Sequence, residues 1–210
     1  MKYLATVMVV LGLLSLPGDG IRAQVPWDAP FMVPPQPTGG LSVLLTDPGW
    51  GVGVLAMWQG SGTPYHLGYR VGLAEDPFDE LAVLGGVDVS AELLAHSREF
   101  PLDVAWVSGV GIGISDAALV TIPLGVSMGR VLTSGQVRIQ PYVTPRVVLD
   151  AWFGDDRCPG PGKCGDDDDL DLGLVVDVGF DLAVSRNWLI RFGAAVGDRE
   201  ALAVGVILPL

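Results

Sequence analysis

Alternation of large apolar residues with small or acidic ones over residues 169–184 constrains the fold of this chain more than any other feature. The stretch reads DLDLGLVVDVGFDLAV, with leucine, valine or phenylalanine at every even position. Successive side chains of a β-strand point to opposite faces, so the stretch predicts a strand with one oily face and one small or acidic face. The oily face must meet either the core of a soluble barrel or the lipid around a membrane barrel.

The same alternation recurs along most of the chain and predicts ten strands. These strands are residues 39–46, 50–58, 65–74, 81–92, 101–114, 117–130, 136–152, 169–184, 187–197 and 200–208. Most exceed the roughly 5–6 residues of an ordinary strand and suit the roughly 9–11 of a tilted membrane strand. Short connections rich in Gly, Pro, Asp and Ser are typical of hairpins. We therefore predict an all-β, single up-and-down antiparallel transmembrane β-barrel. Eight strands are the alternative count. The sequence also leaves open whether residues 39–58 form one bent strand or two.

Two compositional features favour lipid outside the barrel. If the oily faces pointed inward, the solvent-facing strand positions would be mostly glycine, alanine and aspartate, and exposed glycine weakens a strand. A soluble surface also normally carries many lysines, whereas this chain has only Lys2 and Lys163. The alternative is a soluble, periplasmic, lipocalin-like ligand-binding barrel.

In the membrane arrangement the small and charged faces point into a polar lumen. Buried charges are tolerated when opposite signs pair, which predicts a network of inward arginines and aspartates. Its expected members are Arg70, Asp88, Asp103, Arg138, Arg146, Asp150, Asp171, Asp177, Asp181 and Arg191. Many inward glycines leave further volume, which could hold water, a ligand or the segment at 24–38.

The N-terminal part divides into two segments before the barrel at 39–210. Residues 1–23 combine an early lysine with an uncharged apolar run at 4–16, which predicts a cleaved signal peptide and export to the bacterial outer membrane. Residues 24–38 (QVPWDAPFMVPPQPT) are Pro-rich and aperiodic. We expect a periplasmic lead-in there, with a short plug as the alternative.

One connection carries the strongest local chemistry. Cys158 and Cys164 form a close pair in a Pro/Gly loop, which predicts a disulfide in an exported chain. Nearby aspartates are weak candidates for divalent cations such as Ca²⁺, although their spacing does not match an EF-hand loop and a solvated acidic loop is the simpler interpretation. These are Asp155, Asp156, Asp166, Asp167, Asp168 and Asp169.

Nothing in the sequence forms a catalytic motif. The two histidines, His66 and His96, have no nucleophile in a local motif, so we expect a lumen histidine and a loop histidine. We predict no enzyme and no cofactor, with a lipid-modifying enzyme or a protease as a weak alternative. The net charge of −12 argues against nucleic acid as a partner.

The export signal, the alternation and the hairpin spacing together resemble the small bacterial outer-membrane β-barrel proteins typified by OmpX or the OmpA membrane domain. The resemblance implies outer-membrane lipid and the barrel-assembly machinery as partners. We therefore expect a non-enzymatic barrel with a structural or surface-interaction role and a largely filled polar lumen. A narrow channel for small solutes is the alternative.

Overall fold

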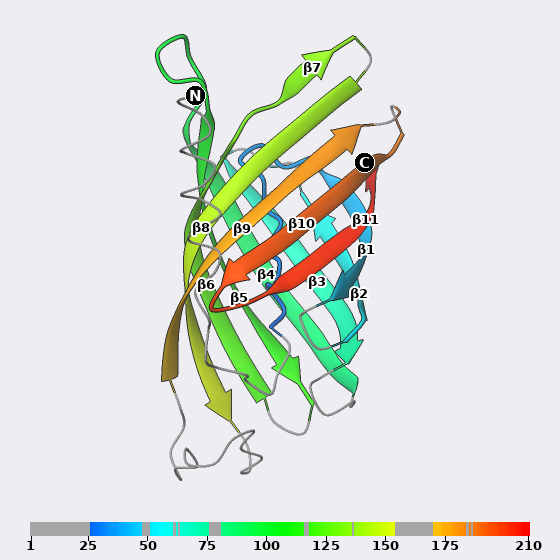
Figure 1. The fold of residues 1–210 in the computed structure, drawn as a ribbon, viewed down its shortest axis with the longest axis vertical. Coiled ribbons are helices and arrows are strands. Elements are labelled where there is room, and N and C mark those ends of the chain that lie inside the picture. The colour runs from blue at the N-terminus through cyan, green and yellow to red at the C-terminus, as the bar shows by residue number, and fades with distance from the viewer. Residues whose placement is uncertain are drawn as a thin grey trace, which may run out of the picture.

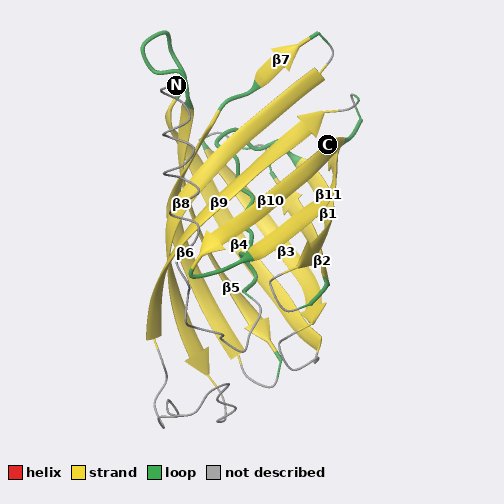
Figure 2. Ribbon diagram, in the orientation of Figure 1, coloured by secondary structure: helices red, strands yellow, loops and turns green. Residues whose placement is uncertain are grey.

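A computed structural model describes residues 26–47, 51–60, 62, 64–75, 81–115, 118–135, 137–153, 170–183, 185 and 187–210. Strands dominate these residues, and Figure 2 shows none of them in a helix. The strands are β1 (Gly40–Asp47), β2 (Gly53–Gln59), β3 (Tyr65–Glu75), β4 (Leu81–Leu94), β5 (Asp103–Ile114), β6 (Ala118–Gly129), β7 (Leu132–Ser134), β8 (Val137–Phe153), β9 (Leu170–Ala183), β10 (Leu189–Gly197) and β11 (Ala201–Pro209).

The strands form a closed antiparallel barrel in chain order (Figure 1). Consecutive strands pair with each other from β1 to β6 and from β8 to β11. β11 pairs with β1 from Leu202 to Pro209, and β6 pairs with β8, which closes the ring. The short strand β7 pairs only with the start of β8, and together they project beyond the rim. Ten strands therefore form the wall. The predicted ten-strand, up-and-down barrel is confirmed, and the eight-strand alternative is wrong because ten strands close the ring. Residues 39–58 contain two separate paired strands, β1 and β2.

The two ends of the barrel differ in what they connect. We call the end where β1 begins and β11 ends the terminal end, and the other the distal end. The turn between β10 and β11, which contains Arg199, lies at the distal end. The β2–β3 and β4–β5 connections and the projecting β7–β8 hairpin lie at the terminal end (Figure 1).

The oily faces point away from the lumen on every side of the barrel. In β9, Leu172 is 68% exposed, whereas the neighbouring Val175 and Asp177 are each 1% exposed. The same alternation of exposed and buried residues runs through β1, β3 and β11. The apolar residues of the opening stretch therefore form the outer surface, and the aspartates between them face inward.

Residues 26–35 lie inside the barrel and are buried throughout. Trp27, Phe31 and Val33 pack with inward residues of β3 to β5, and Met32 packs with inward residues of β1, β2 and β11. Figure 1 shows this segment as the blue trace running within the ring of strands. The position corresponds to the plug that the sequence allowed as an alternative to a lead-in outside the barrel. We refer to residues 26–36 as the plug.

Several predicted features lie outside the described residues. They are the signal peptide at 1–23, the cysteines Cys158 and Cys164, and the acidic residues Asp155, Asp156, Asp166, Asp167, Asp168 and Asp169.

Candidate functional site: the filled lumen

The plug crosses the lumen lengthwise and contacts charged side chains at successive levels. Near the distal end, Asp28 meets Arg199 from the β10–β11 turn and Arg146 from β8. Near the terminal end, the side-chain amide of Gln140 donates to the main-chain oxygen of Gln36 at 3.0 Å. The plug therefore runs from the distal end toward the start of β1.

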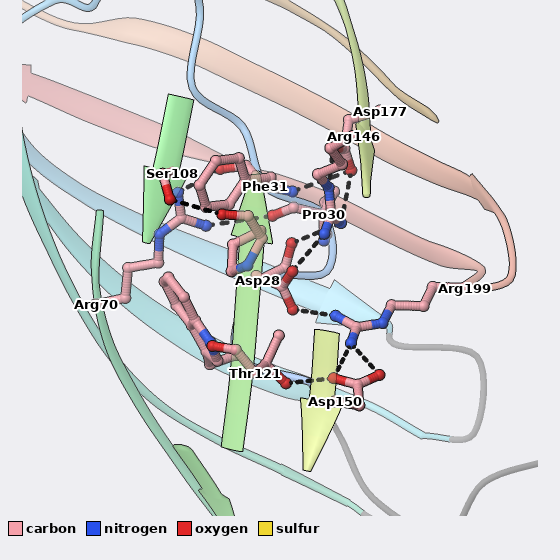
Figure 3. A network of polar contacts seen from close by, with 12 residues as sticks. Asp28, Pro30, Phe31, Arg70, Ser108, Thr121, Arg146, Asp150, Asp177 and Arg199 are labelled. Atoms are coloured by element: carbon pink, nitrogen blue, oxygen red, sulfur yellow. Dashed lines mark hydrogen bonds and ion pairs between the residues drawn. The ribbon is translucent and has the colours of Figure 1, made fainter. Parts of the chain in front are cut away.

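Asp28 is the centre of the polar network drawn in Figure 3. Its carboxylate accepts from the guanidinium groups of both Arg146 and Arg199, and its main-chain oxygen accepts a further bond from Arg146 at 3.1 Å. The side chain is fully buried, with an exposed fraction of 0%. Burial alone would raise its pKa, but the charges of Arg199, Arg146 and Arg70 hold the pKa below its ordinary value, so the carboxylate is ionised.

Both arginines that hold Asp28 also bind an aspartate of the barrel wall. Nε of Arg146 donates to Asp177 at 2.6 Å, and Nη2 of Arg199 donates to Oδ2 of Asp150 at 2.6 Å. Such charge-assisted bonds are about twice as strong as neutral ones. Each guanidinium therefore bridges a strand of the wall and the carboxylate of the plug.

The main chain of the plug is held in the same way. Arg70 on β3 forms an ion pair with Asp88 on β4 at 3.0 Å and donates to the main-chain oxygens of Pro30 and Phe31. The amide of Phe31 in turn donates to Asp177 at 3.1 Å. Buried main-chain groups need such partners, and here the wall supplies them through side chains.

Aromatic groups of the plug pack against the same arginines. The guanidinium carbon of Arg70 lies 4.7 Å from the ring centroid of Phe31 and 5.3 Å from that of Trp27. The guanidinium carbon of Arg146 also lies near Phe31, 5.4 Å from the ring centroid. A cation over an aromatic face within about 6 Å is attracted by the ring quadrupole. The arginines thus bind carboxylate, main chain and aromatic rings of one segment.

Inward glycines make room for the indole of Trp27. A Cβ atom on Gly111 would lie 2.5 Å from Cδ2 of the indole, and one on Gly109 would lie 2.8 Å from its Cη2. A Cβ on Gly86 would collide with three atoms of the same ring. These three glycines from β4 and β5 form a flat pocket, and the indole nitrogen donates to the main-chain oxygen of Thr121 at 3.3 Å. The lumen volume that the sequence left unassigned near these glycines is filled by the plug.

A further ion pair of the wall lies toward the terminal end. Arg191 on β10 binds both carboxylate oxygens of Asp181 on β9, at 2.7 and 2.6 Å, and donates to Gln59 at 2.8 Å. Tyr142 is also buried in this region, and its hydroxyl has no hydrogen-bond partner among the described residues.

The structure brings together most of the predicted network, in one-to-one pairs. The wall pairs are Arg70–Asp88, Arg146–Asp177, Arg191–Asp181 and Asp150 with Arg199. Sequence reasoning missed Asp28 and Arg199, because one lies in an aperiodic segment and the other in a turn. The available signal for Asp28 was its place in a Pro-rich segment, close to the aromatic residues Trp27 and Phe31.

Three predicted members are placed differently. Arg138 is exposed, because β8 extends past the rim there, and it makes no ion pair within the described part of the chain. Asp103 is buried at the terminal end and pairs with His96 at 2.8 Å instead of an arginine. Asp171 is partly exposed at the distal start of β9, opposite Asp150 in the strand register.

The histidines form no recognisable catalytic arrangement with the described residues. His96 contacts Asp103 through both its ring and its main-chain amide. His66 is half-buried on the inward face of β3, and its Nδ1 has no hydrogen-bond partner in the described structure. The described residues, which exclude the acidic connection after β8, contain no group of three or more His, Cys, Asp or Glu that could hold a metal ion.

Comparisons with known proteins add no assignment. No protein-family model matches the chain, and no curated protein is significantly similar to it. Within the described residues, no helix has the length and apolar character needed to cross a membrane.

Proposed function

We propose that this chain is a non-enzymatic β-barrel of the bacterial outer membrane with a structural or surface-interaction role, and that its own N-terminal segment keeps the lumen closed. Outer-membrane lipid and the barrel-assembly machinery are the partners that this role requires. The observation that carries the proposal is the continuous apolar outer surface of a barrel whose polar residues face inward.

The distribution of charge on the outside supports lipid as the surrounding medium. Among the described strand residues, the exposed charged ones are Asp47, Glu75, Glu92 and Arg138, and each lies within two residues of a strand end. The outward positions between the ends carry leucine, valine and isoleucine with few exceptions. A monomer in water rarely exposes an apolar patch of more than a few hundred Å². A belt of this extent therefore suits hydrocarbon better than water.

Aromatic side chains on the outer face gather near the terminal end. Trp58 lies 5.5 Å from Tyr69, and Tyr65 lies 6.5 Å from Trp106, measured between ring centroids. Trp188, just before β10, is also exposed at this end. Tryptophan and tyrosine favour the boundary between lipid and water, where membrane barrels carry aromatic girdles. The cluster supports an interface at the terminal end.

The occupied lumen bears on the alternatives. A solute channel needs an open path, and a lipocalin-like binder needs a cavity, whereas here the plug and its glycine pocket fill much of the interior. We therefore favour a closed barrel over both. The resting protein is expected to show no single-channel conductance in a planar bilayer.

Membrane fractionation with heat-modifiability on a detergent gel tests the proposal. We expect the protein in the outer-membrane fraction, with different migration before and after boiling, because a folded membrane barrel resists the detergent until it is heated. Recovery in the soluble periplasmic fraction with no heat-dependent shift would refute it. Steady conductance of the wild-type protein would leave the membrane location intact but would replace the closed barrel with a channel.

A further inference from the structure

We infer that the lumen is a peptide-binding site, and that the plug is its tethered and displaceable ligand. The ligand class is an extended, Pro-rich peptide with one carboxylate between two aromatic side chains. This inference concerns the interior of the barrel and holds whatever medium surrounds it.

The first observation is that the plug is not part of the sheet. Residues 26–39 join none of the strand pairs, and the wall closes on itself without them. Every hydrogen bond between plug and wall that is drawn in Figure 3 involves a side chain on one partner at least. A segment held by side chains can leave without breaking the ladder of backbone bonds that closes the barrel.

The second observation is the charge balance of the wall. Within the described residues, each of the four lumen arginines has an aspartate of the wall as partner, so the wall pairs remain when the plug is removed. Asp28 is an additional carboxylate, held between Arg146 and Arg199. Its departure would leave two guanidinium groups, already fixed by Asp177 and Asp150, aimed at one empty position. That arrangement is a preformed site for a carboxylate.

The third observation is a set of shaped positions on either side of that site. The glycine pocket formed by Gly86, Gly109 and Gly111 accepts a flat indole. On the other side, Arg70 binds the main-chain oxygens of two consecutive residues and lies over the Phe31 ring. Along the plug, the wall thus binds an aromatic residue, a carboxylate, a stretch of main chain and a second aromatic residue, in that order. A free peptide can supply the same four groups.

The experiment measures binding of a fluorescently labelled synthetic peptide of residues 26–36 (PWDAPFMVPPQ) to the purified, folded full-length protein. In the wild-type protein the tethered copy is present at an effective concentration of roughly millimolar order and excludes the peptide. Asp28→Asn weakens the tethered copy, because removing one partner of a buried, hydrogen-bonded charge pair is costly. We expect this variant to bind the peptide at least about tenfold more tightly than the wild type does.

Matched controls isolate the carboxylate. Glu99→Gln removes a negative charge from an exposed loop residue and should leave peptide binding at the wild-type level. A peptide with asparagine in place of the aspartate should bind the Asp28→Asn protein at least about tenfold more weakly than the parent peptide. Equal binding of the two peptides, or no binding to the Asp28→Asn protein, would overturn the inference.

Folding of each variant is followed separately by the heat-dependent gel shift or, for a soluble protein, by near-UV circular dichroism. If Asp28→Asn does not fold, Phe31→Leu is the second test variant, because it weakens the contacts of the tethered copy with Arg70 and Arg146 and leaves every wall residue of the site unchanged. We expect the same direction of change with a smaller size. If both variants fail to fold while Glu99→Gln folds, the plug is an obligate part of the core and the inference is wrong.

Discussion

Two adjacent glycines on β4 allow a direct test of how the plug packs. Gly85 and Gly86 point to opposite faces of the strand. A Cβ atom on Gly85 would have the oxygen of Arg70, 3.8 Å away, as its nearest neighbour, which is an ordinary contact. A Cβ atom on Gly86 would lie 2.6 Å from Cζ3 of Trp27 and closer still to two other atoms of that ring. Replacement of Gly85 by alanine therefore places a methyl group in open space, whereas the same replacement at Gly86 places it against the plug.

The expected magnitudes follow from these contacts. Glycine inside a strand costs about 0.5–1 kcal/mol relative to alanine, so Gly85→Ala should raise the free energy of unfolding by about that amount. Gly86→Ala gains the same backbone contribution but overpacks an indole that is 1% exposed, which typically costs about 1–3 kcal/mol. The backbone contributions cancel between the two variants. Gly86→Ala should therefore be less stable than Gly85→Ala by about 1–3 kcal/mol.

Equilibrium urea unfolding of both variants under identical lipid or detergent conditions measures this difference. The second half of the test combines Gly86→Ala with Trp27→Ala. Trp27→Ala alone should lower the free energy of unfolding by about 3–5 kcal/mol. In that background Gly86→Ala should become neutral or stabilising, because its methyl group then enters space that the indole has left. Such strong coupling is typical of residues in contact. Equal stability of the two glycine variants, with no coupling to Trp27→Ala, would show that the indole does not occupy this pocket.

Three further predictions address the outer surface, the Arg191–Asp181 ion pair and the effect of pH. Val176→Arg, in the middle of β9, should lower the free energy of unfolding in lipid vesicles by about 2–4 kcal/mol, while Leu170→Arg at the strand end should cost about 0–1 kcal/mol; no dependence on position would contradict a lipid-facing surface. Asp181→Asn leaves the buried Arg191 without its counter-ion and should cost about 3–5 kcal/mol in chemical unfolding, and the double variant with Arg191→Gln should recover part of that loss. The pKa of Asp28 is lowered in the folded state, so this carboxylate stabilises the seated plug above its ordinary value of 3.8, and the contribution disappears as the pH falls below that value. Binding of the labelled peptide to the wild-type protein should therefore stay absent between pH 8 and pH 5, and its appearance in that interval would contradict the assignment.

The strands could be predicted closely because alternation reports directly on a surface with two unlike sides. The predicted ranges 136–152 and 169–184 became Val137–Phe153 and Leu170–Ala183. The short strand Leu132–Ser134 was missed, since three exposed residues after a strand carry no periodic signal and read as part of a turn. Its pairing depends on the length of β8, which extends beyond the rim to meet it.

The sequence predicts which face of a strand each member of the charge network occupies, but not how far along the barrel axis that residue lies. Alternation places Arg138 and Arg146 on the same side of β8, yet only Arg146 is deep enough to meet Asp177. Asp103 was likewise assigned to the correct face, but it lies at the rim, where its neighbour is His96. Register between neighbouring strands and the position of each residue along the barrel axis decide these partners, and a period of two residues contains no information about either.

The plug was the least predictable element because the Pro-rich segment has no period of its own. The signal lay in the wall instead: inward glycines on β4 and β5 leave a space that close packing of a protein interior does not tolerate empty. The wall charges also pair among themselves, with one further carboxylate position between Arg146 and Arg199, so an occupant needs apolar bulk and a single negative charge. Residues 26–33 supply tryptophan, phenylalanine, methionine and valine with a single aspartate, and the structure places them in that space. In a chain of this kind, inward glycines on neighbouring strands together with an aperiodic aromatic segment outside the strands therefore predict which segment fills the lumen.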